Sequence, residues 1–188
     1  MITEKTAIRT ESIYSDDSKK RYSLSIEWDK QKKKALVIMV SAGNTNGVAF
    51  DNSTNLVLSN LVPLDYGSVR IVNLFAAIGN GRAVIEKEQD SDNIKHILNA
   101  VRNVDTVIYA AGTGHMTNKS FRNRQKELLE QLTDYEDKLM CIADVGGKKF
   151  YHPLCPSVRK WELVPFKLSE LMDMTAQHED NTERMATE

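Results

Sequence analysis

Ala35-Leu36-Val37-Ile38-Met39-Val40 is the longest apolar run in this chain of 188 residues, and it is the best guide to the architecture. A strand that is apolar on both faces is typical of the centre of a sheet that helices cover on both sides. The run is far shorter than the roughly twenty apolar residues that a membrane span requires. A lysine-rich segment precedes it at 30–34, and a loop rich in Gly and Asn follows it at 41–52.

Predicted strands and helices alternate on both sides of this run. A half-buried strand is expected before the run, and one of its faces should carry Tyr22, Leu24, Ile26 and Trp28. Gly67 is expected to end the helix that follows the run, because glycine readily takes the left-handed conformation. Further strands are expected at 68–75, 106–111, 139–143 and 161–165, and helices at 53–64, from 92 onward and at 117–135.

This alternation predicts an α/β fold, a three-layer sandwich whose mostly parallel central sheet is flanked by helices. Parallel neighbours in such a sheet are joined by right-handed crossovers. We expect a polar N-terminal arm at 1–20, one α/β domain at 21–168, and an acidic C-terminal tail at 169–188 that forms one or two helical turns and is otherwise flexible. A domain of this length is large enough to bury a substantial core.

Composition narrows the class of protein. The chain has 25 Lys and Arg against 26 Asp and Glu, so the lysine-rich run 30–34 is better explained as a turn between strands than as a phosphate contact. Cys141 and Cys155 are too few for a disulfide framework, and the first residues lack the apolar core of a signal peptide. The four histidines lack the paired spacing of a metal site. We therefore expect a cytoplasmic protein with no membrane segment, metal or cofactor.

A parallel sheet binds its ligands beyond the carboxyl ends of its strands, where loops and helix N-termini converge. Four segments of this sequence are expected at that edge of the sheet, namely 41–52, 73–80, 112–117 and 144–156. Candidate binding or catalytic residues should therefore lie in these four segments.

The first of these segments offers two carboxamides and a carboxylate. Asn44 and Asn46 can pair with the donor and acceptor edge of a nucleobase, although Asn and Gly are also common in simple turns. Asp51 directly precedes a predicted helix, so it either caps that helix or supplies its charge to the chemistry of a site. The capping interpretation is slightly favoured.

The second segment begins inside an apolar strand that contains a single amide. A buried Asn73 must either hold a neighbouring loop through hydrogen bonds or face a ligand, and loop-holding is the commoner case. Phe75 could stack on a base, yet a phenylalanine at the end of a strand usually belongs to the core. Both residues are kept as candidate ligand-binding residues.

The last two segments supply glycines and histidines. Gly112-Thr113-Gly114-His115 lies between a buried strand and a helix, an arrangement that presents backbone N–H groups to an anion. It is not a complete dinucleotide motif or P-loop. His152 follows two glycines on a long loop and can polarise a leaving group or donate to an anion, whereas most lone loop histidines have no such role.

Taken in order, these blocks resemble the bacterial and phage family catalogued as domain of unknown function 1643. The resemblance runs from about Glu11 to Phe166, and Ser41 stands at the first position of the family's Asn-Pro-Ser-Thr-Ala-Asp motif. Asp51 matches an acidic position ten residues after that motif begins. The other matching blocks are Glu11–Asp17, Arg21-Tyr22, Trp28, Tyr66-Gly67, Val72–Phe75, Ala111-Gly112 and His152-Pro153.

At a more distant level, the layout is similar to that of the uracil-DNA glycosylase superfamily. That resemblance implies a water-positioning place at Ser41, a base-reading place at Asn73 and a leaving-group place at His152. The family motif ends in Asp, whereas this chain has the uncharged Asn46 there, so the expected general base is missing. Asp51 can take over that role if its carboxylate points into the cleft.

Three functional hypotheses remain open. The first is a nucleic-acid or nucleotide-binding cleft of glycosylase type, in which the altered motif leaves catalysis undecided. The second is a non-catalytic interaction module that binds a protein partner through its acidic tail, 169–188. The third is an enzyme of free nucleotides or nucleosides that uses 112–115 to bind phosphate. The first hypothesis is preferred.

Overall fold

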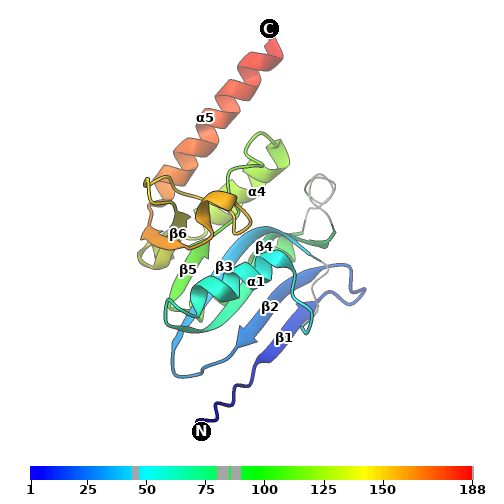
Figure 1. Cartoon of the computed structure of the whole chain (residues 1–188). Coiled ribbons are helices and arrows are strands. Elements are labelled where there is room, and N and C mark those ends of the chain that lie inside the picture. The colour runs from blue at the N-terminus through cyan, green and yellow to red at the C-terminus, as the bar shows by residue number, and fades with distance from the viewer. Residues whose placement is uncertain (44–46, 80–84, 86–89, 188) are drawn as a thin grey trace.

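Seven strands form one sheet in the computed structural model, which describes residues 1–43, 47–79, 85 and 90–187 (Figure 1). Across the sheet, the strand order is β1-β2-β4-β3-β5-β6-β7. The strands are β1 Arg9–Tyr14, β2 Arg21–Glu27, β3 Lys33–Ala42, β4 Tyr66–Ile78, β5 Thr106–Tyr109, β6 Leu139–Ala143 and β7 Glu162–Pro165. The helices in the described residues are α1 Asn52–Leu61, α3 Ser91–Arg102, α4 Lys119–Glu130 and α5 Leu168–Thr187, with 3-10 turns η1 Thr133–Lys138 and η2 Pro156–Val158.

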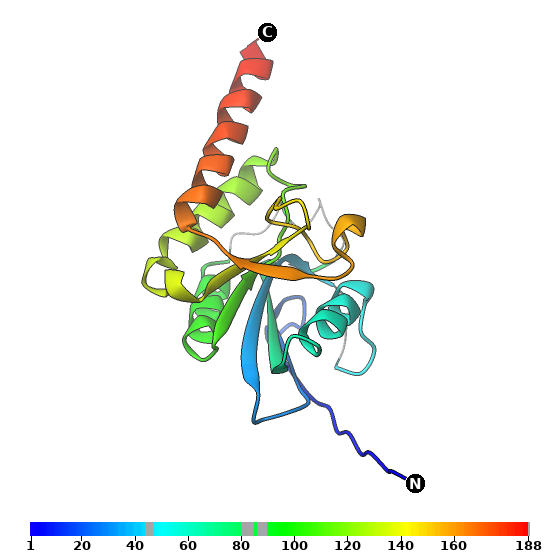
Figure 2. The same cartoon turned by 60° about the vertical axis from the view of Figure 1, so that its left-hand side comes forward.

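Helices cover both faces of the sheet, and β3 lies at its centre (Figure 2). On one face, Val57 and Leu61 of α1 share a core with Val37 of β3. On the opposite face, apolar residues of α3, α4 and α5 share a second core with Ile38 of β3. All six residues of the run 35–40 are buried. The α/β class and the central position of this strand are therefore confirmed.

The sheet is mixed, which corrects the expectation of a mostly parallel one. β3 runs parallel to β4 and to β5, and β5 runs parallel to β6. In contrast, the pairs β1–β2, β2–β4 and β6–β7 are antiparallel. Parallel neighbours need a long crossover, usually a helix, whereas the connections 15–20 and 144–161 contain no α-helix and reverse the chain direction.

Both ends of the chain form more regular structure than the sequence indicated. Residues 9–14 of the expected N-terminal arm form the edge strand β1, which pairs with β2. The expected flexible tail is helical and belongs to α5, which is anchored by the buried Leu168, Leu171 and Thr175. The side-chain amide of Gln125 in α4 donates to the Thr175 hydroxyl at 3.0 Å. Figure 1 shows α5 continuing away from the body of the molecule. No helix among the described residues combines the length and the apolar character that crossing a membrane requires.

A β-bulge near the start of β2 changes the expected side-chain pattern. The pairing of β2 with β1 skips Tyr22 between two consecutive residues of β1. Such a bulge alters which face of the sheet the neighbouring side chains occupy. Leu24 and Ile26 join the core on the α1 side, but Tyr22 stacks on His96 of α3, with ring centroids 4.2 Å apart. The predicted single face therefore holds for Leu24, for Ile26 and for Trp28, which packs against the same core, and is wrong for Tyr22.

Gly67 does not end helix α1, as the sequence indicated, but belongs to β4. The left-handed residue ahead of that strand is Asp65, with φ of 64°. Gly67 is needed for space, because a Cβ there would lie 1.9 Å from the carbonyl oxygen of Asp29. The N–H groups of Trp28 and Asp29 both donate to the Gly67 carbonyl at 2.9 Å. Close approach of two chain segments therefore explains this glycine.

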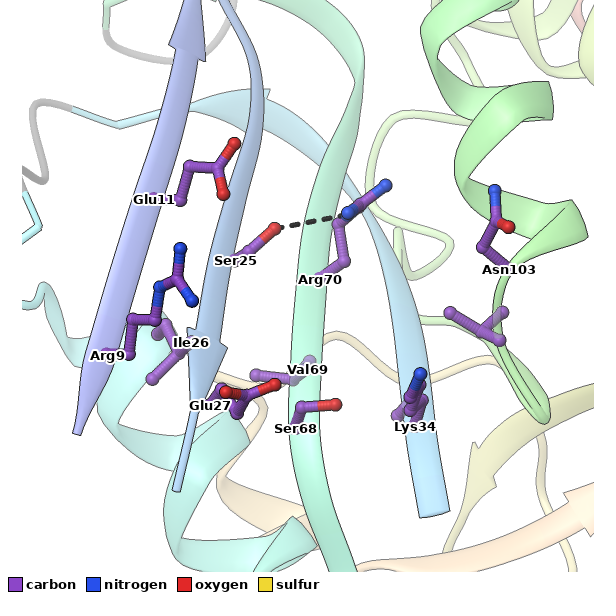
Figure 3. A pocket seen from close by; sticks show the side chains of 12 residues that line it. Arg9, Glu11, Ser25, Ile26, Glu27, Lys34, Ser68, Val69, Arg70 and Asn103 are labelled. Atoms are coloured by element: carbon purple, nitrogen blue, oxygen red, sulfur yellow. Dashed lines mark hydrogen bonds between the residues drawn. The ribbon is translucent and has the colours of Figure 1, made fainter. Parts of the chain in front are cut away.

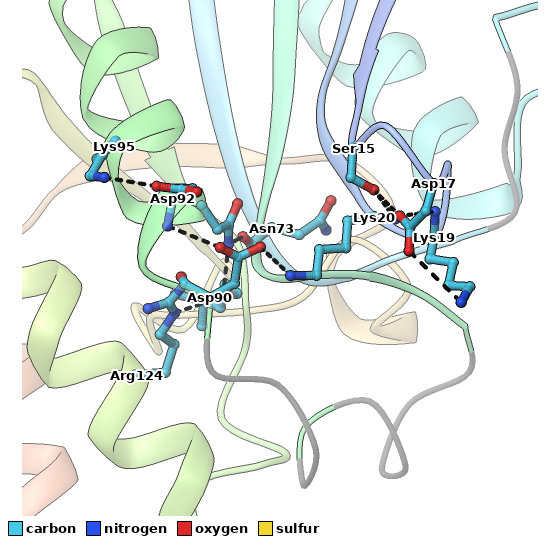
Figure 4. Close-up of polar contacts among 11 residues, drawn as sticks. Ser15, Asp17, Lys19, Lys20, Asn73, Asp90, Asp92, Lys95 and Arg124 are labelled. Carbon is cyan, nitrogen blue, oxygen red and sulfur yellow. Dashed lines mark hydrogen bonds and ion pairs between the residues drawn. The ribbon is translucent and has the colours of Figure 1, made fainter.

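A polar cluster joins the end of β4 to the beginning of α3 (Figure 4). Asp90 caps α3 by accepting a hydrogen bond from the N–H of Asp92 at 2.9 Å, and it forms an ion pair with Lys20 at 2.7 Å. Arg124 of α4 donates to the carbonyl oxygens of Asp90 and Leu74. Because Asp90 is 7% exposed, these charge-assisted contacts are made largely out of water.

Asp90→Asn is expected to reduce the free energy of unfolding by about 1–2 kcal/mol at pH 7. Burial alone raises the pKa of Asp90, but the hydrogen bonds from Lys20 and Asp92 and the charge of Lys20 together lower it below the ordinary 3.8. The stabilisation is therefore fully present above pH 3.8 and is lost as the pH falls through the lower folded value.

Urea unfolding at pH 7 and at about pH 3 measures this difference, which should shrink at the lower pH. Asp134→Asn, at an exposed carboxylate, is the control and should change the stability little. An Asp90→Asn deficit of equal size at both pH values would contradict the prediction.

Candidate functional site

A cavity of about 380 Å³ lies where β3, β4 and β5 end, and we call it the central cleft. This position agrees with the rule that α/β sheets bind ligands beyond the carboxyl ends of their parallel strands. The cleft brings together five predicted site residues, Ser41, Asp51, Gly114, His115 and His152. Its other lining residues are Arg21, Met39, Val40, Gly43, Ser53, Gly79, Ala111 and Leu154.

His152 brings a neutral imidazole to the central cleft. Its Nδ1 accepts a hydrogen bond from the N–H of Leu154 at 3.2 Å, so the ring proton lies on Nε2. Burial lowers the pKa of His152 below its ordinary 6.5, the nearby His115 lowers it further, and Asp51 opposes both. At neutral pH, the side chain is therefore a hydrogen-bond donor that carries no positive charge.

Hydrogen bonds fix the loop that leads to His152. The Asp144 carboxylate accepts the Tyr151 hydroxyl at 2.5 Å and the N–H groups of Gly146 and Lys148 at 2.9 and 3.0 Å. The hydrogen bond to Asp144, together with partial burial, raises the pKa of Tyr151 to about 12. Tyr151 also packs against the core on the α1 side, so the residue before His152 is held by its hydroxyl and by its ring.

Gly112→Ala is expected to destabilise the fold by about 1–2 kcal/mol and to displace the His152 imidazole. Gly112 has φ of 70°, and a Cβ there would lie 3.0 Å from the Cβ of His152 and 3.2 Å from its backbone nitrogen. Gly114→Ala is the control, because a Cβ at Gly114 would meet no atom within 4 Å. Urea unfolding and imidazole ¹⁵N chemical shifts test both effects. Equal stability of the two variants, with unchanged His152 shifts, would refute this role of Gly112.

Asp51 caps helix α1 and lines the central cleft at the same time. Its Oδ1 accepts a hydrogen bond from the N–H of Thr54 at 2.7 Å, which confirms the capping prediction. Its negative charge also acts within the cleft. Burial lowers the pKa of Arg21 and the pKa of His152, and the charge of Asp51 opposes both changes. A role for this carboxylate in chemistry stays a prediction.

The two strand candidates lie in the core and do not line the cleft. Asn73 is 1% exposed, and its side-chain amide donates to the carbonyl of Ser41 at 2.8 Å, which confirms the loop-holding interpretation. Phe75 is also 1% exposed and belongs to the core on the α3 side. The candidates Asn44 and Asn46 fall outside the described residues.

Arg21 is the candidate residue that sequence reasoning missed. In a regular strand, strict alternation would place Arg21 on the face opposite Leu24 and Ile26. The bulge at Tyr22 breaks this alternation, and Arg21 lines the cleft while it is 2% exposed. Burial lowers the pKa of Arg21, and the negative charge of Asp51 opposes that change. A guanidinium keeps its positive charge in such surroundings.

A second cavity, of about 410 Å³, lies near the amino ends of β3 and β4 (Figure 3). Figure 3 shows side chains of both charges around it, among them Arg9, Glu11, Glu27 and Arg70. The Nε of Arg70 donates to the Ser25 hydroxyl at 3.1 Å. Because this groove lies away from the carboxyl edge of the parallel strands, the central cleft is the better candidate site.

Groups that form hydrogen bonds are prominent in the central cleft. Ser41 and Ser53 supply hydroxyl groups to its lining, and His115 supplies a second imidazole. Three glycines also line the cleft and have no side chain to cover the backbone, namely Gly43, Gly79 and Gly114. In the part of the chain that the structure describes, no cluster of three or more His, Cys, Asp or Glu side chains is arranged to hold a metal ion. The cleft is equipped to recognise a polar or anionic ligand through hydrogen bonds.

Comparison with known proteins assigns the chain to a family. No curated protein matches it. The model of the family described as "Protein of unknown function (DUF1643)" matches residues 21–154, a range that contains every residue found to line the central cleft. Because this match covers more than half of the chain, the protein belongs to the DUF1643 family.

Proposed function

We propose that the central cleft binds a nucleotide, either free or within a nucleic acid, with the nucleobase next to His152. The neutral imidazole of His152 carries this proposal, because it keeps one N–H for a ligand and a base carbonyl oxygen is a suitable acceptor. The volume of about 380 Å³ lies in the range of small-ligand sites. The distant resemblance to glycosylases supports the same assignment as an analogy of fold.

The same residues support cleavage of an N-glycosidic bond. When the bond between C1′ and the base nitrogen breaks, its electrons move to the base, and the N–H of His152 stabilises the charge that develops on a carbonyl oxygen. A water molecule forms the new bond to C1′ and releases a proton, which the departing base takes up. Asp51, which lines the same cleft, orients that water in place of the carboxylate that the altered loop lacks.

Titration of labelled single-stranded and duplex oligonucleotides, with and without uracil, tests this function. We expect binding that weakens with added salt, because phosphate contacts release counterions. Alkali treatment of the same mixtures then detects abasic sites, and strand breaks at uracil would establish base excision. Absence of binding at low salt to every oligonucleotide and mononucleotide would refute the proposed function.

Two alternatives stay proposals with tests of their own. A small-molecule enzyme would bind free nucleotides with Gly112 and Gly114 close to phosphate, and such a ligand would raise the melting temperature of the native protein. An interaction module would use α5, which extends from the body of the molecule (Figure 2). A pull-down with and without residues 169–188 tests the second alternative, and identical partners in both samples would count against it.

A further inference from the structure

We infer that the ligand of the central cleft carries a phosphate group and that Arg21 binds this group, an inference that rests on the function proposed above. It defines the ligand class as a phosphorylated nucleoside rather than a free base or nucleoside. The phosphate belongs either to a mononucleotide or to the backbone of a nucleic acid, and both sources present anionic phosphate oxygens to a guanidinium.

Arg21 has the burial and the position of a recognition residue. It lines the cleft although it is 2% exposed, so its guanidinium lies largely out of bulk water. A charge in such surroundings attracts an opposite charge more strongly than one on the surface. The planar guanidinium can also donate two parallel hydrogen bonds to a phosphate.

The residues on both sides of Arg21 hold its backbone in place before a ligand binds. Tyr22, the skipped residue of the bulge, stacks on His96 of α3. Lys20, on the other side, forms the 2.7 Å ion pair with Asp90 (Figure 4). Because Tyr22 is anchored to α3 and Lys20 to the cap of α3, little further ordering of β2 is needed when a ligand binds. Such preorganisation increases affinity.

The charges in the cleft specify how the ligand is oriented. Asp51 is the acidic side chain among the described residues that line the cleft, and His152 is neutral at pH 7. A phosphate is attracted to Arg21 and repelled by Asp51, which confines it to one part of the cleft. The uncharged base then lies toward His152, whose N–H can donate to a carbonyl oxygen of that base. A phosphorylated nucleoside satisfies both ends of this arrangement.

Isothermal titration with nucleoside 5′-monophosphates, the matching nucleosides and a short single-stranded oligonucleotide tests the inference. We expect the wild-type protein to bind a nucleotide at least about tenfold more tightly than its nucleoside. Arg21→Met should abolish this preference and leave the affinity for the nucleoside within about twofold. Arg21→Lys should keep part of the preference, because lysine retains the charge but not the paired donors. Arg9→Met, at an exposed arginine of β1, is the control and should change neither affinity.

The outcomes separate this inference from the proposed function. Equal wild-type affinities for nucleotide and nucleoside would overturn the role of Arg21 while the proposed function stands. No binding of any nucleotide, nucleoside or oligonucleotide would overturn both. A preference that depends on Arg21 supports the inference, and the tighter of mononucleotide and oligonucleotide then identifies the source of the phosphate. Circular dichroism verifies folding, and Arg21→Lys carries the test if Arg21→Met does not fold.

Discussion

Gly67→Ala is expected to lower the free energy of unfolding by about 3 kcal/mol or more. The added Cβ would lie 1.9 Å from the carbonyl oxygen of Asp29 and 2.8 Å from the Cβ of Lys32. A backbone carbonyl cannot rotate away as a flexible side chain can, so β4 and the segment 28–32 must separate. That separation also weakens the hydrogen bonds from the N–H groups of Trp28 and Asp29 to the Gly67 carbonyl.

Urea unfolding of the wild type, Gly67→Ala and Gly114→Ala measures this effect. Gly114 is the matched control, because a Cβ there meets no atom within 4 Å. Its replacement should therefore change the free energy of unfolding by no more than about 0.5 kcal/mol. If Gly67→Ala were as stable as the control, the segment 28–32 would have to move aside at little cost, contrary to the prediction.

His152→Ala is expected to weaken the binding of a nucleobase ligand by about tenfold or more. Where base excision occurs, the same change should slow it by about a hundredfold or more. The reason is that the N–H of His152 is oriented by the hydrogen bond that Leu154 donates to Nδ1, and alanine supplies no replacement donor. His152→Gln should recover part of the loss, because its amide can donate to the same acceptor.

Fluorescence anisotropy with labelled oligonucleotides measures the binding of these variants, and the alkali assay measures excision. His178→Ala is the control, because His178 lies in α5 and does not line the central cleft. A His152→Ala protein that is folded and binds every ligand as well as the His178→Ala control would exclude His152 from the site.

The pH dependence of stability gives an independent measure of the same histidine. Burial and His115 hold the pKa of His152 below 6.5, against the effect of Asp51. The stability associated with the neutral form is therefore present above pH 6.5 and is lost as the pH falls through the folded value. As the pH falls from about 7.5 to about 5, the wild type should therefore lose unfolding free energy relative to His152→Gln.

Local sequence pattern predicted much of the central domain. The apolar run 35–40 lies in β3 between two helix-covered faces, and the strand predicted at 139–143 has the same bounds as β6. The rule that buried amides need partners correctly indicated that Asn73 holds the loop at Ser41. In each case, the tertiary contacts favour the same structure as the local sequence does, so the prediction from sequence agrees with the observed structure.

The elements that local pattern mispredicted are those whose form depends on distant partners. Strand β1 has little apolar character of its own and forms along β2, while α5 is anchored to α4 through a few buried residues. The directions of β1 and β7 follow from connections without an α-helix, which periodicity does not reveal.

Periodicity and turn chemistry were enough to predict the α/β class, the central strand and the edge of the sheet where Ser41, Asp51, His115 and His152 meet. Tertiary structure was needed to place Arg21 in the cleft, because its orientation depends on a bulge in the pairing of two strands. The physical reason is the distance along the chain between the residues that interact. Apolar periodicity is a property of neighbouring residues, whereas strand direction, register and the burial of a charge depend on contacts between residues far apart in the chain.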